Sequence, residues 1–149
     1  LRQIMPRVEI EFPKHVNFTT EIVVGCEDVN SSEHLGHDRL ISLMHKARQS
    51  YFTELGFESL NRKDLGIVIA DLAISYRQES FLNDVLKFEI ALENISKKSC
   101  EVYFRISFMN KNKAAPLIAI AKMGLVFFDY KERKPTLIPV HFLKALKLS

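Results

Sequence analysis

Two periodic stretches dominate the first half of the chain. From Phe18 to Cys26, alternate residues are apolar or β-branched, and this period of two predicts a strand with one buried face. From Asp38 to Leu55, apolar residues recur at spacings of three and four, which predicts a long helix with one buried side. Gly56 follows as a natural C-terminal stop, and Asp38 and Ser32 are expected to cap the helix start.

Four further strands are predicted in the second half. They cover residues 67–76, 85–93, 100–108 and 116–129, and a short final helix is predicted over 140–148. The connections between these strands are of hairpin length, so consecutive strands are expected to run antiparallel. One strand, one long helix and four strands in this order predict an α+β domain, in which an antiparallel sheet wraps around one long central helix.

A polar, ionisable loop over residues 26–38 separates the first strand from the long helix. It carries Asp28, Asn30, Glu33, His34 and His37. The N–H groups of a first helical turn have no acceptor within the helix, and the helix dipole is positive at this end. The loop is therefore the predicted functional site, and it suits an intermediate that develops negative charge.

Length and composition indicate a single globular domain. The 149 residues are 47% hydrophobic and 26% charged, with a formal net charge of +3. One domain over 1–149 is expected, with its core in 18–139, and residues 1–4 are interpreted as upstream sequence without a function. The basic clusters at 97–98, 111–113 and 131–134 are interpreted as solvated turns, with a phosphorylated ligand or polyanion as the alternative. No nucleic-acid partner is expected.

The two cysteines give no metal-binding pattern. Cys26 and Cys100 lack CxxC and Cys/His spacing, so no metal site is expected. Both are interpreted as small buried residues of a reducing compartment, with a disulfide between them as the open alternative. No apolar run reaches the roughly 18 residues of a membrane span, and no signal-peptide pattern is found. We therefore expect a cytoplasmic protein without a membrane span.

Several short motifs follow one another in a characteristic order. They are Asp28-Val29-Asn30, His34-Leu35-Gly36, Leu43-Met44-His45-Lys46-Ala47-Arg48, Ile74-Ser75-Tyr76, Asn83-Asp84-Val85-Leu86, Phe127-Phe128-Asp129, Lys134-Pro135 and Ile138-Pro139. Their order and spacing resemble the hotdog-fold acyl-CoA thioesterases, both 4-hydroxybenzoyl-CoA thioesterase-like and acyl-carrier-protein thioesterase-like. The resemblance implies a hotdog fold and hydrolysis of an acyl-CoA or acyl-carrier-protein thioester to a free acid and a thiol. It implies no cofactor beyond the coenzyme A of the substrate, and a homodimer or homotetramer with sites between subunits.

The resemblance also implies roles for loop residues. In the 4-hydroxybenzoyl-CoA thioesterase branch, the position that matches Asn30 holds the catalytic aspartate. An amide cannot act as a general base or as a carboxylate nucleophile, so Asn30 is expected to orient the acyl carbonyl or a water. His34 is then the expected general base or water-positioning residue, with Glu33 as its competitor. Asp28 either takes part in catalysis or only satisfies backbone N–H groups of the loop.

Thioester hydrolysis also needs hydrogen-bond donors for the oxyanion of the tetrahedral intermediate. The amides of Leu35, Gly36 and His37 are the expected donors, because Gly36 has no side chain to keep the acyl group away. Asp71, an acid within an apolar strand, is interpreted as an edge or dimer-facing residue, or as a carboxylate supplied to the site across a subunit interface. The acyl tunnel is expected to be lined by Leu40, Met44 and Phe81.

Two other functions stay open. Hydratases and dehydratases of the same fold carry the signature Asp-x-Asn-Pro-x-His, which resembles the stretch from Asp28 to His34. Here the proline is absent and one extra residue separates Asn30 from His34, which counts against this function. The second alternative is a non-catalytic acyl-thioester-binding module, because the expected catalytic aspartate is missing.

Overall fold

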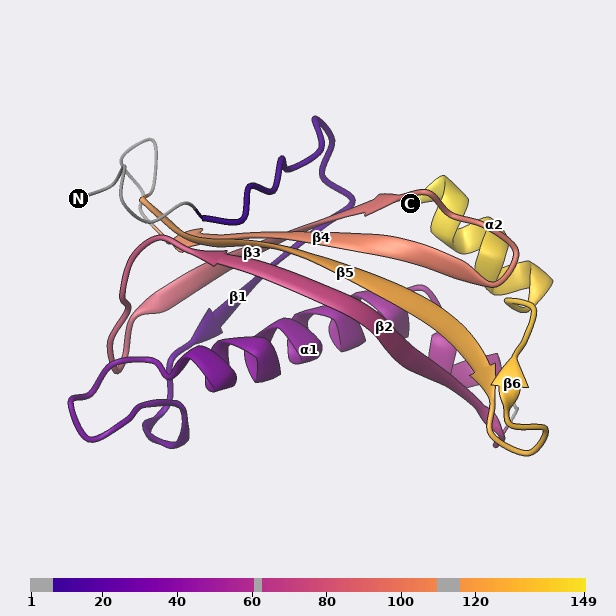
Figure 1. The fold of residues 1–149 in the computed structure, drawn as a ribbon, viewed down its shortest axis with the longest axis horizontal. Coiled ribbons are helices and arrows are strands. Elements are labelled where there is room, and N and C mark those ends of the chain that lie inside the picture. The colour runs from indigo at the N-terminus through magenta and orange to yellow at the C-terminus, as the bar shows by residue number, and fades with distance from the viewer. Residues whose placement is uncertain (1–6, 61–62, 110–115) are drawn as a thin grey trace.

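The computed structural model describes residues 7–60, 63–109 and 116–149, which form one antiparallel sheet with helices against it (Figure 1). The sheet has the order β1-β3-β4-β5-β2, and the short β6 also pairs with β5. The strands are β1 (Phe18–Val23), β2 (Leu65–Tyr76), β3 (Val85–Glu93), β4 (Ser99–Phe108), β5 (Leu117–Asp129) and β6 (Lys134–Pro135). The helices are α1 (His37–Glu54) and α2 (Val140–Leu148), with the 3₁₀ turns η1 (Cys26–Asp28) and η2 (Phe57–Leu60).

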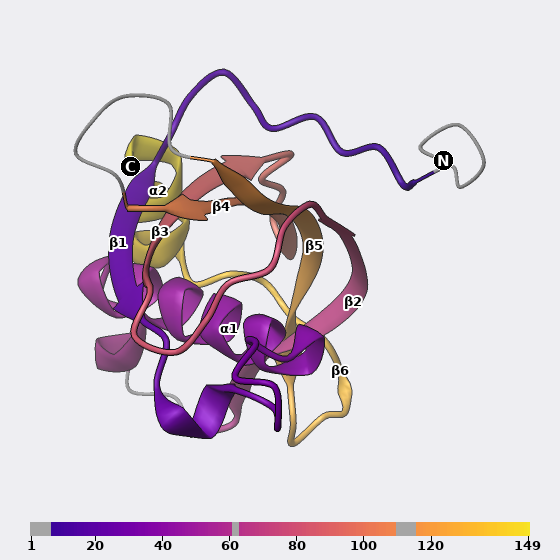
Figure 2. The same ribbon diagram turned by 90° about the vertical axis from the view of Figure 1, so that its left-hand side faces the viewer.

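The curved sheet encloses α1 on its concave side (Figure 2). Alternate residues of each strand face this helix, since side chains of a strand point to opposite faces in turn. The buried core contains residues such as Phe88, Ile90, Phe104 and Ala121 from the strands and Met44 from the helix. This confirms the predicted α+β arrangement of an antiparallel sheet around one long helix.

The final helix α2 extends the core at the C-terminal end of α1. Its buried Phe142 packs edge-on against Phe52 of α1, with ring centroids 5.3 Å apart, and also contacts Phe57 and Phe127. Such aromatic pairs add to the stability that their buried area provides. The predicted final helix over 140–148 is confirmed, and it leaves the N-terminal end of α1 uncovered by α2 (Figure 1).

The first strand ends earlier than predicted. The backbone leaves the sheet after Val23, and Gly25 precedes the 3₁₀ turn η1. Cys26 therefore lies exposed in that turn, and its interpretation as a small buried residue is wrong, whereas Cys100 is buried. Burial raises the pKa of the Cys100 thiol to about 12. Both cysteines are free, so the alternative of a disulfide between them is not formed.

The start of α1 also differs from the prediction. The residue at the N-cap is Gly36, with no side-chain capping hydrogen bond, and the helix begins at His37. Asp38 lies within the first turn, where the positive end of the helix dipole stabilises its negative charge. Ser32 lies in the preceding loop. The prediction that Asp38 or Ser32 caps the helix start is therefore wrong. Gly56, with a φ of 90°, confirms the predicted stop.

Two of the three basic clusters, at 97–98 and 131–134, are exposed in connections next to strands, as predicted, except that Lys134 begins β6. The cluster at 111–113 falls outside the described residues. Within the described ranges, no helix has the length and apolar character needed to cross a membrane.

Candidate active site

The loop between β1 and α1 folds back on itself ahead of the helix. The Asn30 N–H donates to the His34 carbonyl at 2.9 Å, and the Glu33 N–H donates to the Asn30 carbonyl at 2.9 Å. Glu33 takes a left-handed φ of 63° at this turn. A second pairing, between Val29 and Leu35, closes the base of the loop. The loop is therefore a compact turn whose backbone groups are largely paired.

Asn30 holds this turn together through its side chain. Its Oδ1 accepts the N–H of Ser32 at 3.0 Å and the N–H of His34 at 3.2 Å. Asparagine commonly stabilises turns in this way. The carbonyl half of the amide is thus engaged within the loop, which leaves the Nδ2 group as the half that could donate to a ligand; that role stays a prediction.

Asp28 has a structural role. It is only 2% exposed, and its Oδ2 accepts the Gly25 N–H at 2.9 Å. Its Oδ1 lies 3.5 Å from the Nη2 of Arg39, in the first turn of α1. The structure therefore favours the reading in which Asp28 satisfies loop N–H groups, and it joins the loop to the helix start.

His34 is paired with a carboxylate that the sequence did not single out. Its Nδ1 lies 3.0 Å from Oε1 of Glu79, and its ring packs edge-on against Phe81 at 4.8 Å between centroids. An imidazole whose Nδ1–H donates to a carboxylate leaves Nε2 as a proton acceptor, the arrangement of an oriented general base. The predicted competitor Glu33 is exposed, and among the described residues its carboxylate forms no ion pair.

Glu79 was missed because it lies in the aperiodic segment 77–80, between β2 and β3, 45 residues after His34. A backbone bridge between His34 and Phe81 brings the two segments together. The only signal in the sequence was an acid within a polar connection, and such acids are usually solvated. A pairing of distant loops cannot be read from local periodicity.

Two of the three predicted oxyanion donors are not available. The Leu35 N–H donates to the Ser80 carbonyl at 2.9 Å, and the Gly36 N–H donates to the Asp28 carbonyl at 3.1 Å. The prediction is therefore wrong for Leu35 and Gly36, because chain pairing uses both amides. His37 is the first residue of the helix, and the N–H groups of a first turn have no acceptor within the helix. The His37 amide therefore stays a predicted donor, as the first amide of this turn.

A pocket of about 290 Å³ opens beside these amides, between the start of α1 and the β2–β3 connection. His37 and Leu40 line it from the helix, and Tyr76, Glu79 and Ser80 line it from the other side. The Tyr76 hydroxyl donates to the His37 carbonyl at 2.8 Å, and burial, followed by the charge of Asp38, raises the pKa of Tyr76. The Ser80 Oγ is buried, and none of the described residues offers it a hydrogen-bond partner. The pocket thus combines apolar walls with a few polar groups, as ligand sites do.

The predicted acyl tunnel is only partly found. Leu40 lines the pocket. Met44 is fully buried in the core, and Phe81 is 43% exposed beside His34, so neither lines the pocket. The prediction of these two as tunnel residues is wrong because Met44 is closed off in the core and Phe81 packs against the His34 ring instead.

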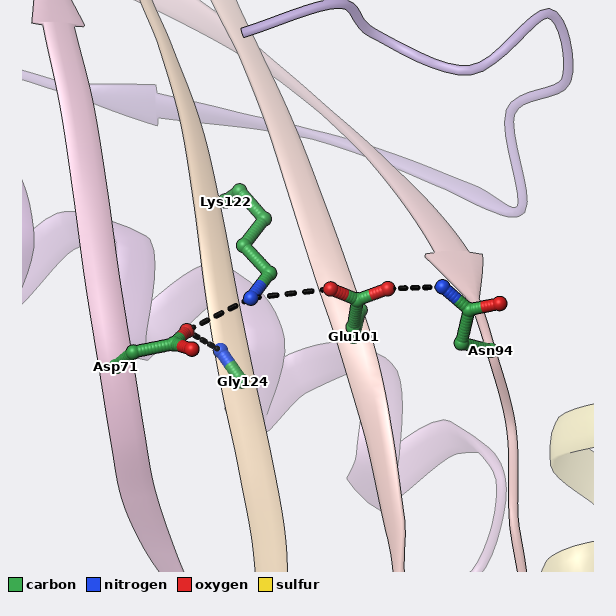
Figure 3. Close-up of polar contacts among 5 residues, drawn as sticks. All are labelled: Asp71, Asn94, Glu101, Lys122 and Gly124. Carbon is green, nitrogen blue, oxygen red and sulfur yellow. Dashed lines mark hydrogen bonds and ion pairs between the residues drawn. The ribbon is translucent and has the colours of Figure 1, made fainter. Parts of the chain in front are cut away.

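Asp71 lies away from this loop within the chain. It is on the convex face of the sheet, opposite α1, where its Oδ1 contacts Lys122 Nζ at 2.8 Å and accepts the Gly124 N–H at 3.0 Å (Figure 3). Lys122 also contacts Glu101 at 3.0 Å, and Glu101 accepts a hydrogen bond from Asn94. The hydrogen bond from Lys122 lowers the pKa of Asp71. Asp71 therefore belongs to a surface ion-pair network in this subunit.

The fold and the loop define a class, the hotdog-fold thioesterases. The family model of the Thioesterase-like superfamily matches residues 24–146, which include the loop, both helices and most of the sheet. The chain belongs to this superfamily. The predicted resemblance is thus confirmed, and so is the predicted class of enzyme, a thioester hydrolase.

Solved structures share the fold at low sequence identity. A 1,4-dihydroxy-2-naphthoyl-CoA thioesterase from Synechocystis, Slr0204, matches with a TM-score of 0.76 and 19% identity, over 87% of this chain and 95% of its own. A mutant of 4-hydroxybenzoyl-CoA thioesterase, complexed with 4-hydroxybenzoyl-CoA, matches with a TM-score of 0.76 and 18% identity, over 87% and 97%. The BH1999 gentisyl-coenzyme A thioesterase matches at 0.72 and 17%, over 87% and 99%. Comparison of the sequence with curated proteins gave no match.

Proposed function

We propose that this thioesterase hydrolyses an acyl-CoA at the pocket beside the N-terminus of α1, with His34 as general base. The observation that carries the proposal is the 3.0 Å pair between His34 Nδ1 and Glu79, because Glu79 also lines the pocket. Coenzyme A is favoured over a carrier protein as the thiol because the three structural relatives named above act on CoA thioesters. No cofactor beyond the substrate's own coenzyme A is required by this chemistry.

In the proposed reaction, His34 acts from beside the pocket, which it does not itself line but to which its partner Glu79 belongs. His34 Nε2 takes a proton from a water, and the resulting hydroxide attacks the thioester carbonyl carbon. The oxyanion of the tetrahedral intermediate accepts hydrogen bonds from the backbone N–H groups of the first turn of α1, where His37 lies. As the C–S bond breaks, the His34 imidazolium returns its proton to the thiolate, so that a free acid and a thiol leave. Glu79 stabilises the imidazolium between the two transfers.

Asn30 has a supporting role in this proposal. Since its Oδ1 is held by two backbone N–H groups, the Nδ2 group has a fixed direction. It donates to the attacking water or to the thioester carbonyl, and it cannot accept a proton. The alternative of a non-catalytic binding module is favoured by the same residue, because an amide stands where relatives of one branch carry the catalytic carboxylate.

The test is a panel of aromatic and aliphatic acyl-CoA substrates, with thiol release followed by a chromogenic disulfide. Thiol release well above the rate without protein is expected. An enoyl-CoA is included, because loss of its double bond without thiol release would indicate a hydratase. Tight acyl-CoA binding with no thiol release would indicate a binding module.

We also propose that the protein is a homodimer, alone or as half of a homotetramer, formed along the edge of β2. This 12-residue strand is at one end of the sheet order and pairs with β5 alone among the described strands. Its Ile69 and Leu72 are 43% and 38% exposed. A long apolar edge strand favours pairing with another chain.

We propose a cytoplasmic location because the two cysteines are free, which suits a reducing compartment.

A further inference from the structure

The middle of α1 carries a buried positive charge for which the described part of the chain supplies no acidic partner. Arg48 is 7% exposed, and its Nε is buried with no hydrogen-bond partner among the residues that the structure describes. Among the described residues, the hydrogen-bond partner of the guanidinium is His45, whose Nδ1 accepts from Arg48 Nη2 at 3.0 Å. The guanidinium also lies over the Phe52 ring, 5.4 Å from its centroid. An aromatic face and a neutral imidazole reduce the cost of this burial, but neither supplies a negative charge.

A buried unpaired charge is costly, and arginine does not escape the cost by losing its proton. Burial lowers the pKa of Arg48, and the ionisable group that acts against this shift is the Cys100 thiol. Burial raises the pKa of that thiol to about 12, so Cys100 is neutral at pH 7 and provides no counter-charge. His45 accepts the Arg48 hydrogen bond as a neutral imidazole, and burial together with the Arg48 charge lowers the pKa of His45.

A pocket of about 250 Å³ lies against this guanidinium. Its polar lining comes from His45, Arg48, Gln49 and Thr53 of α1, and from Glu58. A water occupies about 30 Å³ in the liquid, so the pocket has room for a small anion. It shares no lining residue with the pocket beside His37, and 11 residues of helix, about 16 Å, separate His37 from Arg48. It is therefore a separate site on the same helix.

We propose that this pocket binds a small oxyanion, a carboxylate or phosphate group, on the guanidinium of Arg48. The planar donor fork of arginine matches the two oxygens of such a group. His45 fixes the guanidinium plane through Nη2, and Nε is closed off from solvent, so the remaining N–H groups of the Nη1 and Nη2 end are the donors for the anion. Gln49 and Thr53 add neutral hydrogen-bonding groups at the pocket wall. Glu58 is exposed at the rim, and among the described residues it forms no ion pair with Arg48, so its charge opposes anion entry.

Inorganic phosphate is the probe, and the intact protein is titrated at constant ionic strength set with chloride. The melting temperature is expected to rise with phosphate, linearly in the logarithm of its concentration once that exceeds the Kd, since a ligand of the folded state stabilises it. Arg48→Met should weaken phosphate binding about tenfold or more, the loss expected for hydrogen bonds to a charged group. Without phosphate, Arg48→Met should melt at or above the wild-type temperature, because an unpaired buried charge is removed. Glu58→Gln, the matched control, should bind phosphate more tightly.

Three results would overturn the proposal. The first is a wild type that does not respond to phosphate. The second is an equal response in Arg48→Met, which would show binding elsewhere. In the third, the wild type does not respond to phosphate and Arg48→Met sediments as dissociated subunits. That result would mean that an acidic residue of a second copy, rather than an anion, pairs with Arg48. If Arg48→Met does not fold, Arg48→Lys, which keeps the charge and loses the fork, must still weaken phosphate binding, or the proposal fails.

Discussion

At the scale of single residues, the candidate site depends on side chains held by charged or backbone partners. Asn30 is fixed by two backbone N–H groups, and His34 is fixed by Glu79. Both depend on a loop that Asp28 joins to Arg39. Preorganised groups of this kind are effective in catalysis because they need not reorient during the reaction. In the proposed mechanism, the amide at position 30 cannot remove a proton, and this task falls to the imidazole of His34.

A second charged pair, on the convex face, gives a pH-dependent prediction. Arg105 donates two hydrogen bonds of 2.9 Å to Glu89, and these lower the pKa of Glu89. A carboxyl group with a lowered folded pKa stabilises the fold above its unfolded pKa, about 4.3, and that contribution is lost as the pH falls through the folded pKa. Glu89→Gln should therefore lower the free energy of unfolding at pH 7 by about 1 kcal/mol, since Arg105 is partly screened by solvent.

Urea denaturation of wild type and Glu89→Gln at a series of pH values checks this prediction. The difference between the two proteins should shrink as the pH falls and should vanish below the folded pKa of Glu89. Glu132→Gln, in an exposed turn, is the control and should match the wild type at every pH. A Glu89→Gln difference that does not depend on pH would mean that the pair acts through packing rather than charge.

At the scale of elements, periodicity predicted the long helix, four of the strands and α2 to within one or two residues, because each buries one continuous apolar face. Element ends were less predictable. The chain leaves the sheet at Val23 rather than Cys26, and the backbone of Gly36 caps α1 in place of Ser32 or Asp38. Pairings between loops, such as those that occupy the Leu35 and Gly36 amides, left no periodic signal at all.

The end of α1 gives an element-scale prediction. Gly56 has a φ of 90°, a conformation that costs a side-chain-bearing residue about 1 kcal/mol. Gly56→Ala should therefore lower the free energy of unfolding by about that amount. Gly25→Ala is the control, because Gly25 has a φ of −91° and a new Cβ would meet only the movable Glu27 carboxylate. Urea denaturation compares them, and an equal loss in both variants would remove the conformational explanation.

At the scale of the whole molecule, the proposed assembly depends on the edge of β2. A lysine at the exposed Ile69 should prevent edge pairing, since charged side chains protect sheet edges from other chains. Ile69→Lys is expected to sediment as a folded monomer at micromolar concentration, whereas the wild type sediments as a dimer or tetramer. Val23→Lys, at an exposed position on the opposite edge strand, should leave the assembly intact. A wild-type monomer would contradict both the assembly and any site shared between subunits.

The most direct measurement is the steady-state rate of thiol release from an acyl-CoA by wild type, His34→Ala, Glu79→Gln and Glu33→Gln. We predict that His34→Ala lowers kcat about 10²-fold or more, as removal of a general base does, with folding, assembly and KM nearly unchanged. Glu79→Gln should lower kcat less, because the imidazole remains and loses only the carboxylate that orients it, and Glu33→Gln should retain activity. Wild-type turnover by a folded His34→Ala protein would contradict this account, and a loss confined to Glu33→Gln would move the base to Glu33.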